Sequence, residues 1–137
     1  MIVDTSALVA IVLGESGWEV IREALSEKPK SIPASALTEL HLVTAGRSED
    51  DAVVAIALVN SLIAEGLEIA AFEGHHAILT RTAREQYGKG NGRGGMLNFG
   101  DLMVYAIAKA RGEPLLCTGR DFSTTDLVIH PASRTDS

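Results

Sequence analysis

The chain has 137 residues, a net charge of −6, and a composition that is 46% hydrophobic but only 4% aromatic. This length suits one compact domain and leaves little room for a second hydrophobic core. A core with few aromatic side chains must be built from Ala, Val, Ile and Leu, which is typical of helices packed on a β-sheet. The acidic balance excludes a protein that coats nucleic acid through bulk positive charge, so any contact with nucleic acid must be local.

The single cysteine, Cys117, lies in an apolar run, so the chain has no intramolecular disulfide. A buried thiol of this kind suits a reducing cytoplasm. The apolar stretch over residues 7–13 follows no basic residue and is too short to span a bilayer. We therefore predict a cytoplasmic protein without a signal peptide or a membrane anchor.

The first half of the chain alternates between strand and helix patterns. It predicts a strand, two helices, a strand and a helix, in that order, over residues 1–3, 5–13, 16–27, 31–34 and 35–46. Asp4 directly follows the first strand, Pro29 stops the second helix, and Ser35 is placed to cap the third.

The second half continues the alternation. It predicts a helix, a strand, a helix, a glycine-rich loop, a helix and two strands, over residues 50–65, 67–72, 73–87, 88–95, 98–111, 115–118 and 127–129. We expect the loop to be mobile, because glycine occupies five of its eight positions. Residues 1–131 are predicted to form the domain, and residues 132–137 a disordered C-terminal tail.

Strands that alternate with helices predict an α/β fold with a central parallel β-sheet and helices on both faces. Ligands of such sheets gather beyond the carboxyl ends of the strands. Asp4, Ser35 and Thr118 fall at these ends, so distant parts of the sequence are expected to meet at one crevice.

Four acidic residues stand near this crevice. Asp4 can serve as a helix N-cap, Asp101 can form a capping box with Asn98, and Asp121 follows a strand where a turn role is common. Glu39 lies in a helix with apolar residues on nearly every side, and a buried unpaired carboxylate is costly. It therefore requires a cation or a water-filled cleft.

Taken together, the four acids indicate a metal site, since carboxylates packed close together repel one another unless divalent cations compensate. A donor set made of oxygen selects Mg²⁺ or Mn²⁺, and such ions activate water for attack on a phosphodiester. The sequence therefore predicts hydrolytic cleavage of nucleic acid. Asp126 lies a few residues beyond Asp121; it is either a solvated turn residue or an assisting acid.

Basic residues gather around the glycine-rich loop, namely Arg81, Arg84, Lys89 and Arg93. They would form a rim that contacts RNA phosphates beside the metal. A solvated helix face next to a flexible loop would have the same composition, and the sequence leaves both interpretations open.

The order of motifs closely resembles the PIN-domain ribonucleases of the VapC toxin family over essentially the whole chain. The matching segments are Met1-Ile2-Val3-Asp4-Thr5-Ser6, the Ser-Ala-Leu-Thr-Glu-Leu helix around Glu39, Leu97-Asn98-Phe99-Gly100-Asp101, and Leu115-Leu116-Cys117-Thr118-Gly119-Arg120-Asp121-Phe122. The resemblance implies a toxin of a toxin–antitoxin pair. It also implies an endoribonuclease that depends on Mg²⁺ or Mn²⁺ and cuts tRNA or rRNA, a homodimer, and a VapB-like antitoxin as partner.

Carried over by position, the resemblance makes the acids Asp4, Glu39, Asp101 and Asp121 both the catalytic residues and the metal ligands. It makes Thr5, Ser6, Asn98 and Thr118 polar groups that orient carboxylates or water. Many relatives have a further acid directly before the last aspartate, where this chain has Arg120. Arg120 puts a second metal in question and could contact a phosphate instead.

Two other classes compete with this interpretation. Aspartyl-phosphate phosphatases also begin with an apolar strand that ends in Asp, but they need a second acid two residues later, where this chain has Ser6. A catalytically inactive PIN fold that binds RNA or protein is the main alternative. The presence of all four acids argues against it.

Overall fold

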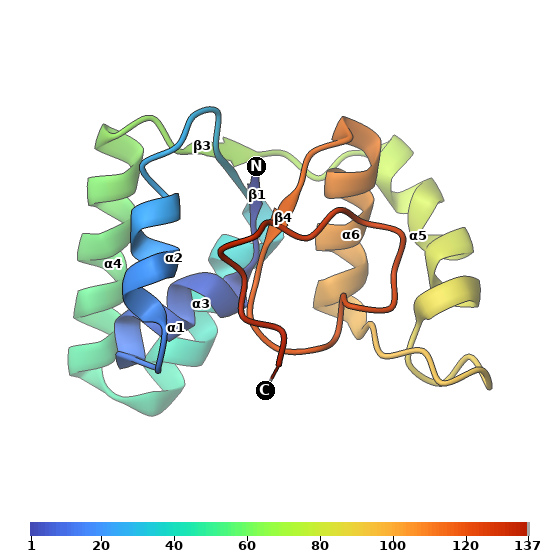
Figure 1. Cartoon of the computed structure of the whole chain (residues 1–137), viewed down its shortest axis with the longest axis horizontal. Coiled ribbons are helices and arrows are strands. Elements are labelled where there is room, and N and C mark those ends of the chain that lie inside the picture. Colours follow the sequence, from blue (N-terminus) through green and yellow to red (C-terminus); the bar gives the residue numbers. More distant parts are fainter. Residues whose placement is uncertain (137) are drawn as a thin grey trace.

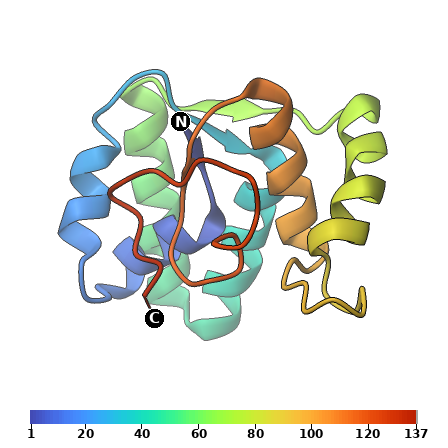
Figure 2. The ribbon, with the colours of Figure 1, turned by 45° about the vertical axis from the view of Figure 1, so that its right-hand side comes forward.

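The computed structural model describes residues 1–136 and contains one central sheet of parallel strands. Within these residues the strands are β1 (Ile2–Val3), β2 (Ser31–Pro33), β3 (Glu68–Ala70) and β4 (Leu115–Leu116), in the spatial order β3-β2-β1-β4. The helices are α1 (Thr5–Leu13), α2 (Trp18–Ala24), α3 (Ala34–Arg47), α4 (Glu49–Ala64), α5 (Gly74–Tyr87) and α6 (Phe99–Arg111). Figures 1 and 2 show α1, α2 and α4 on one side of the sheet and α5 and α6 on the other. The predicted α/β architecture is confirmed.

The strands are short but completely buried where they cross the core. Ile2, Val3, Ile32 and Leu115 have no exposed surface. Helices cover both faces of the sheet, so these strands are continuous apolar runs rather than alternating ones. Cys117 is also fully buried, and burial raises the pKa of its thiol to about 12, in keeping with an inert core thiol.

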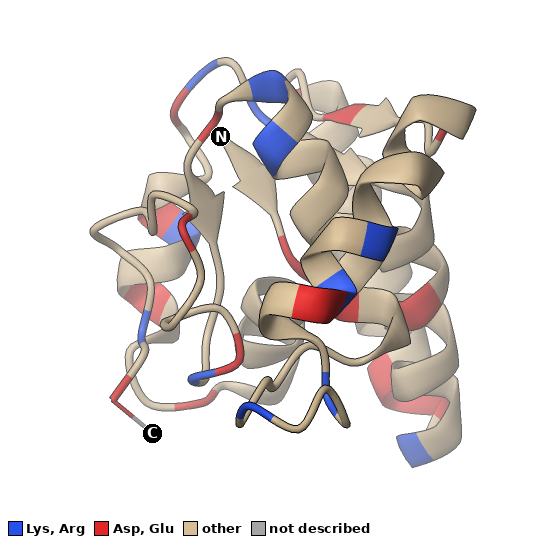
Figure 3. Cartoon of the chain, turned by 90° about the vertical axis from the view of Figure 1, so that its right-hand side faces the viewer, with Lys and Arg blue, Asp and Glu red and all other residues tan. Residues whose placement is uncertain are grey.

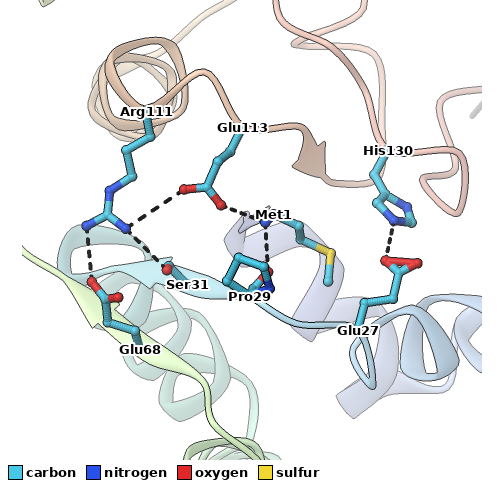
Figure 4. Close-up of polar contacts among 8 residues, drawn as sticks. All are labelled: Met1, Glu27, Pro29, Ser31, Glu68, Arg111, Glu113 and His130. Carbon is cyan, nitrogen blue, oxygen red and sulfur yellow. Dashed lines mark hydrogen bonds and ion pairs between the residues drawn. The ribbon is translucent and has the colours of Figure 1, made fainter.

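Polar contacts tie together the amino ends of the strands (Figure 4). The amino group of Met1 donates to the Glu113 carboxylate at 2.7 Å and to the Pro29 carbonyl at 2.9 Å. Arg111, at the end of α6, donates to Glu68 at 3.1 Å and to Ser31 at 3.3 Å. These residues flank or begin all four strands. Charged groups therefore stabilise the amino ends of the strands. The opposite side of the sheet, where the carboxyl ends of the strands lie, is free of these contacts.

The segment after the last predicted strand is paired with the core. The Arg134 amide donates to the Cys117 carbonyl, and the Arg134 carbonyl accepts from the Gly119 amide at 2.8 Å. The Ser133 hydroxyl accepts from the Cys117 amide at 3.0 Å. The prediction of disorder from residue 132 onward is therefore wrong for Ser133 and Arg134. Ser137 lies outside the described residues.

Two local predictions are also wrong. Helix α3 begins at Ala34 with Pro33 at its N-cap, and Ser35 lies inside the helix with its buried hydroxyl unpartnered within the described chain. Proline has no side chain that can accept a hydrogen bond, so α3 begins without a side-chain cap. The strand predicted over residues 127–129 is a single bridge between Ile129 and Leu115.

The remaining helices and strands lie within a few residues of their predicted bounds. No helix within residues 1–136 is long and apolar enough to cross a membrane.

We expect Arg134→Ala to lower the free energy of unfolding by about 1 kcal/mol. The Arg134 guanidinium donates to Glu15 at 3.2 Å, and its aliphatic stem lies under Gly17, so the substitution removes both an ion pair and packing. Thermal unfolding followed by circular dichroism measures the loss, with the exposed Arg81→Ala as a control that removes equal charge. Equal unfolding midpoints for the two variants would contradict a stabilising role for the contacts of Arg134 with Glu15 and Gly17.

Candidate active site

The carboxyl edge of the sheet carries a cavity of about 240 Å³, which we call the acid cleft. All four predicted acids line it, together with polar, apolar and further acidic side chains: Asp4, Glu39, Asp101, Asp121, Thr5, Ser6, Asn98, Thr118, Glu15, Val9, Val43 and Phe122. The acids come from the end of β1, from α3, from α6 and from the turn after β4. The parallel topology thus brings together residues from both ends of the chain.

Asp4 caps α1 and faces the cleft at the same time. One of its carboxylate oxygens accepts from the Ser6 amide at 3.1 Å and from the Ser6 hydroxyl at 2.6 Å. Burial raises the pKa of the Asp4 carboxyl above its usual value, and the negative charge of Glu39 adds to this, against the hydrogen bonds from Ser6. The cap role and the site role considered for this residue are therefore compatible.

Asp101 lies in the first turn of α6 within a capping box. Its amide donates to the Asn98 side chain at 2.9 Å, and its carboxylate accepts from the Asn98 amide at 3.2 Å. Burial, together with the negative charges of Asp4 and Asp121, raises the pKa of Asp101 to about 7, against the lowering effect of the Asn98 hydrogen bond. The cleft thus holds an excess of negative charge that a cation would relieve.

Glu39 reaches the cleft from α3 past Gly100. A Cβ atom at Gly100 would lie 2.5 Å from the Glu39 Oε2 atom, so any other residue there would force this carboxylate to move. Glu39 is half-buried and lines the acid cleft, and Leu42 of the same helix is 71% exposed. This position agrees with the expectation that Glu39 requires a cation or a water-filled cleft.

The four predicted polar residues lie around the acids, but in different roles. Ser6 and Asn98 contact carboxylates directly. Thr118 acts through Ser6, because the Thr118 amide donates to the Ser6 hydroxyl at 2.9 Å. Thr5 donates to the Ala36 carbonyl at 2.9 Å and so joins α1 to the helix that carries Glu39.

Glu15, a fifth acid, lines the cleft and was not singled out in the sequence. It follows Gly14, whose left-handed φ of 63° ends α1 and turns the chain back toward the site. Arg134 holds its carboxylate at 3.2 Å. The sequence did contain a signal for this residue: Glu15 is an acid that directly follows the glycine at the end of α1, one helix length from Asp4.

Asp126 lies outside the acid cleft. It accepts from the Tyr105 hydroxyl and from the Lys109 amine, both at 2.6 Å. These hydrogen bonds outweigh the raising effect of burial and hold the pKa of Asp126 below its usual value. The carboxylate is committed to α6, so we assign it no part in the site.

The basic residues lie on α5, on the loop that follows it and beside Asp121 (Figure 3). Arg81, Arg93 and Arg120 are exposed, and Arg84 donates to the Gly90 carbonyl at 3.4 Å. Among the five basic residues considered for RNA binding, Lys89 is the one that lines a cavity adjoining the acid cleft.

A second group of possible metal ligands lies at the start of α5. Within the described residues, Glu73, His75 and His76 form the one trio of such side chains whose ligand atoms all lie within 4.8 Å of one another. This trio lines a different cavity, shared with Arg111, and contributes nothing to the acid cleft. No three of the cleft acids within the described residues meet this distance criterion.

Comparison with known proteins identifies the family of this chain. The PIN-domain profile matches residues 1–127. Ribonuclease VapC42 of Mycobacterium tuberculosis is 42% identical over 134 residues, covering 96% of this chain and 98% of the relative. The VapBC2 complex of Rickettsia felis, solved with a promoter DNA fragment, contains a chain with TM-score 0.70 and 18% identity, covering 94% of this chain and 96% of that chain.

A third similar protein is Mycobacterium tuberculosis VapC20, described as a toxin that cleaves the sarcin–ricin loop. It has TM-score 0.67 and 22% identity, covering 93% of this chain and 95% of that chain. The structural likenesses establish the fold, and the sequence relatives establish the family. The chain belongs to the PIN-domain family and, within it, to the VapC ribonucleases, as its motifs suggested.

Proposed function

We propose that this protein is the toxin of a toxin–antitoxin pair and a metal-dependent endoribonuclease that hydrolyses phosphodiester bonds in RNA. The observation that carries the proposal is the convergence of Asp4, Glu39, Asp101 and Asp121 on one cleft. VapC42, with 42% identity, is named a ribonuclease, and VapC20 is described as a toxin that cleaves the sarcin–ricin loop. These names support RNA as the substrate, and we propose that the RNA is a tRNA or an rRNA.

The cleft suits Mg²⁺ or Mn²⁺. Its charged donors are carboxylates only. Burial first, and neighbouring carboxylates second, raise the pKa of Asp4 and of Asp101, and a bound cation would offset both effects. Asp4, Glu39, Asp101 and Asp121 would hold the ion. When bound, such an ion activates a water and stabilises the charge that develops on the phosphate.

The surrounding residues fix the carboxylates. Ser6 holds one oxygen of Asp4 through two hydrogen bonds, and the capping box sets the orientation of Asp101. Such locked geometry lowers the cost of reorganisation during the reaction. Lys89, which lines the adjoining cavity, would bind a phosphate next to the cleaved bond. The neighbouring arginines would add local positive charge that offsets the acidic surface.

A VapB-like antitoxin and a second copy of the chain are the proposed protein partners. The solved relative from Rickettsia felis is a VapBC complex. Exposed apolar side chains beside the acid cleft, Leu42 at 71% and Phe99 at 81%, support a protein interface there.

We expect the purified protein, freed of antitoxin, to cut total cellular RNA into discrete fragments with Mg²⁺ or Mn²⁺. EDTA should abolish the cleavage because the carboxylates then lack their cation. Sequencing of the fragment ends identifies the RNA and the bond.

Intact RNA in the presence of folded protein would instead favour the inactive PIN-fold module that binds RNA or protein. Growth on overexpression separates the two readings further. Asp4→Asn should relieve growth arrest caused by a nuclease and change little for a binder.

A further inference from the structure

A second cavity, which we call the side pocket, adjoins the acid cleft. It measures about 210 Å³ and is lined by Lys89, Gly95, Met96, Asn98 and Asp121. Asn98 and Asp121 also line the acid cleft, so the two cavities share a wall. The side pocket therefore lies directly beside the acid cleft.

The glycine-rich loop that forms this pocket is braced at its neck. The Lys89 amide donates to the Leu97 carbonyl at 2.8 Å, and the Leu97 amide donates to the Tyr87 carbonyl at 3.0 Å. A Cβ atom at Gly95 would lie 2.3 Å from the Gly88 carbonyl oxygen, so the two sides of the neck meet at a point that excludes side chains.

The Asn91 side chain connects several parts of the loop. Its side-chain oxygen accepts from the backbone amides of Arg93 at 2.8 Å and Gly95 at 3.1 Å, and its side-chain nitrogen donates to the Glu85 carbonyl at 3.1 Å. The loop thus has a defined shape despite its glycines. A binding site on it is preorganised, which lowers the entropic cost of capturing a ligand.

The lining offers the groups that a single-stranded nucleotide requires. Lys89 supplies a positive charge for a phosphate, and Met96, 40% exposed, supplies a flexible apolar surface for the face of a base. The side-chain oxygen of Asn98 accepts from the Asp101 backbone amide, so the side-chain NH₂ group of Asn98 remains as a donor at the shared wall. Unstacked bases of single-stranded RNA are bound by this combination of charge and apolar contact.

We propose that the side pocket binds the nucleotide next to the cleaved phosphodiester, with Lys89 on its phosphate and Met96 against its base. The inference rests on the proposed nuclease function, since it places the cleaved bond at the acid cleft. It makes Lys89 and Met96 determinants of substrate choice, separate from the acids that carry the reaction.

A binding assay with an RNA analogue that cannot be cleaved tests this proposal. The probe is a fluorescein-labelled pool of random single-stranded 2′-O-methyl hexanucleotides, followed by anisotropy in Mg²⁺ across a salt series. We expect Met96→Ala to weaken binding about 3- to 10-fold and Met96→Leu to restore most of it. Lys89→Ala should reduce the slope of log affinity against log salt by about 0.7, the share of one phosphate on a single strand.

Arg93→Ala is the matched control, because it removes the same charge from the same loop but lines neither cavity. If bulk charge alone mattered, Arg93→Ala and Lys89→Ala would lose equal affinity and equal slope. That equality, together with wild-type binding by Met96→Ala, would overturn the proposal.

Cleavage kinetics give a second readout on the RNA identified for the wild type. Met96→Ala and Lys89→Ala should raise KM while kcat stays within about twofold of wild type, since the acids are untouched. A fall in kcat alone would overturn the assignment. If the wild type itself cuts no RNA, the proposed function fails, and the hexanucleotide assay still decides whether the pocket binds a nucleotide.

Discussion

Asp101→Asn should abolish RNA cleavage, with a loss of at least about 100-fold in kcat/KM. The amide retains an oxygen for the capping box, so α6 should still begin at the same place. The asparagine side chain cannot, however, supply the negative charge with which Asp101 would bind a divalent cation. Single-turnover cleavage, with circular dichroism to establish folding, measures the effect.

The same variant should be more stable than wild type in EDTA. The pKa of Asp101 is raised to about 7, first by burial, so its ionisation opposes folding. For wild type this cost is absent below the unfolded pKa near 4, grows as the pH rises, and is complete above pH 7. The unfolding midpoint of Asp101→Asn should therefore exceed that of wild type at pH 8 and match it at pH 4.

Added Mg²⁺ should reverse this order. A cation bound between the carboxylates stabilises the folded wild type by mass action and gives Asp101→Asn little benefit. Equal Mg²⁺-induced shifts in the two proteins would contradict a role for Asp101 as a metal ligand. Retained cleavage by the variant would contradict its catalytic role.

Gly100→Ala should lower kcat/KM by about 10- to 100-fold while the fold remains intact. The added methyl group would lie 2.5 Å from the Glu39 Oε2 atom, so the carboxylate must move. Glu39 is flexible and half-buried, and its displacement costs the fold little but removes it from its place in the cleft. Alanine also favours a helix over glycine, so the unfolding midpoint should hold or rise.

Gly46→Ala is the matched control, because it makes the same change on α3, the helix of Glu39, where a Cβ atom meets nothing within 4 Å. It should gain stability by up to about 1 kcal/mol and keep full activity. Comparison of the two variants by thermal unfolding and cleavage separates the steric effect from helix propensity. Full activity in Gly100→Ala would show that Glu39 tolerates displacement.

The architecture and the acids were predictable because they rest on strong local signals. Buried strands such as Leu115–Leu116 are continuous apolar runs, and Asp4 and Asp101 stand at helix starts that a single sequence reveals. Parallel topology then places the carboxyl ends of the strands together. No contact between distant residues was needed for this step.

What the sequence did not reveal depends on contacts between distant segments. The clearance that Gly100 gives Glu39 involves two helices far apart in the chain, and the pairing of Arg134 with Glu15 spans 119 residues. The position at the chain terminus favoured disorder for the C-terminal segment, but the Arg134 backbone pairs with Cys117 and Gly119. The hydrogen bonds of the Asn91 side chain could not be predicted for the same reason, since a run of glycines indicates only that the backbone is free to adopt many conformations.

The order of strands has a consequence for synthesis of the protein. β1 is made first, whereas its neighbour β4 is made near the end, and the Thr118 amide reaches back 112 residues to the Ser6 hydroxyl beside Asp4. Contacts this distant in sequence form only after both partners have left the ribosome. A chain still being translated carries Asp4 and Glu39 without Asp121. Interrupted translation would therefore release fragments that lack a complete acid cleft, and we expect such fragments to leave the RNA of the cell intact.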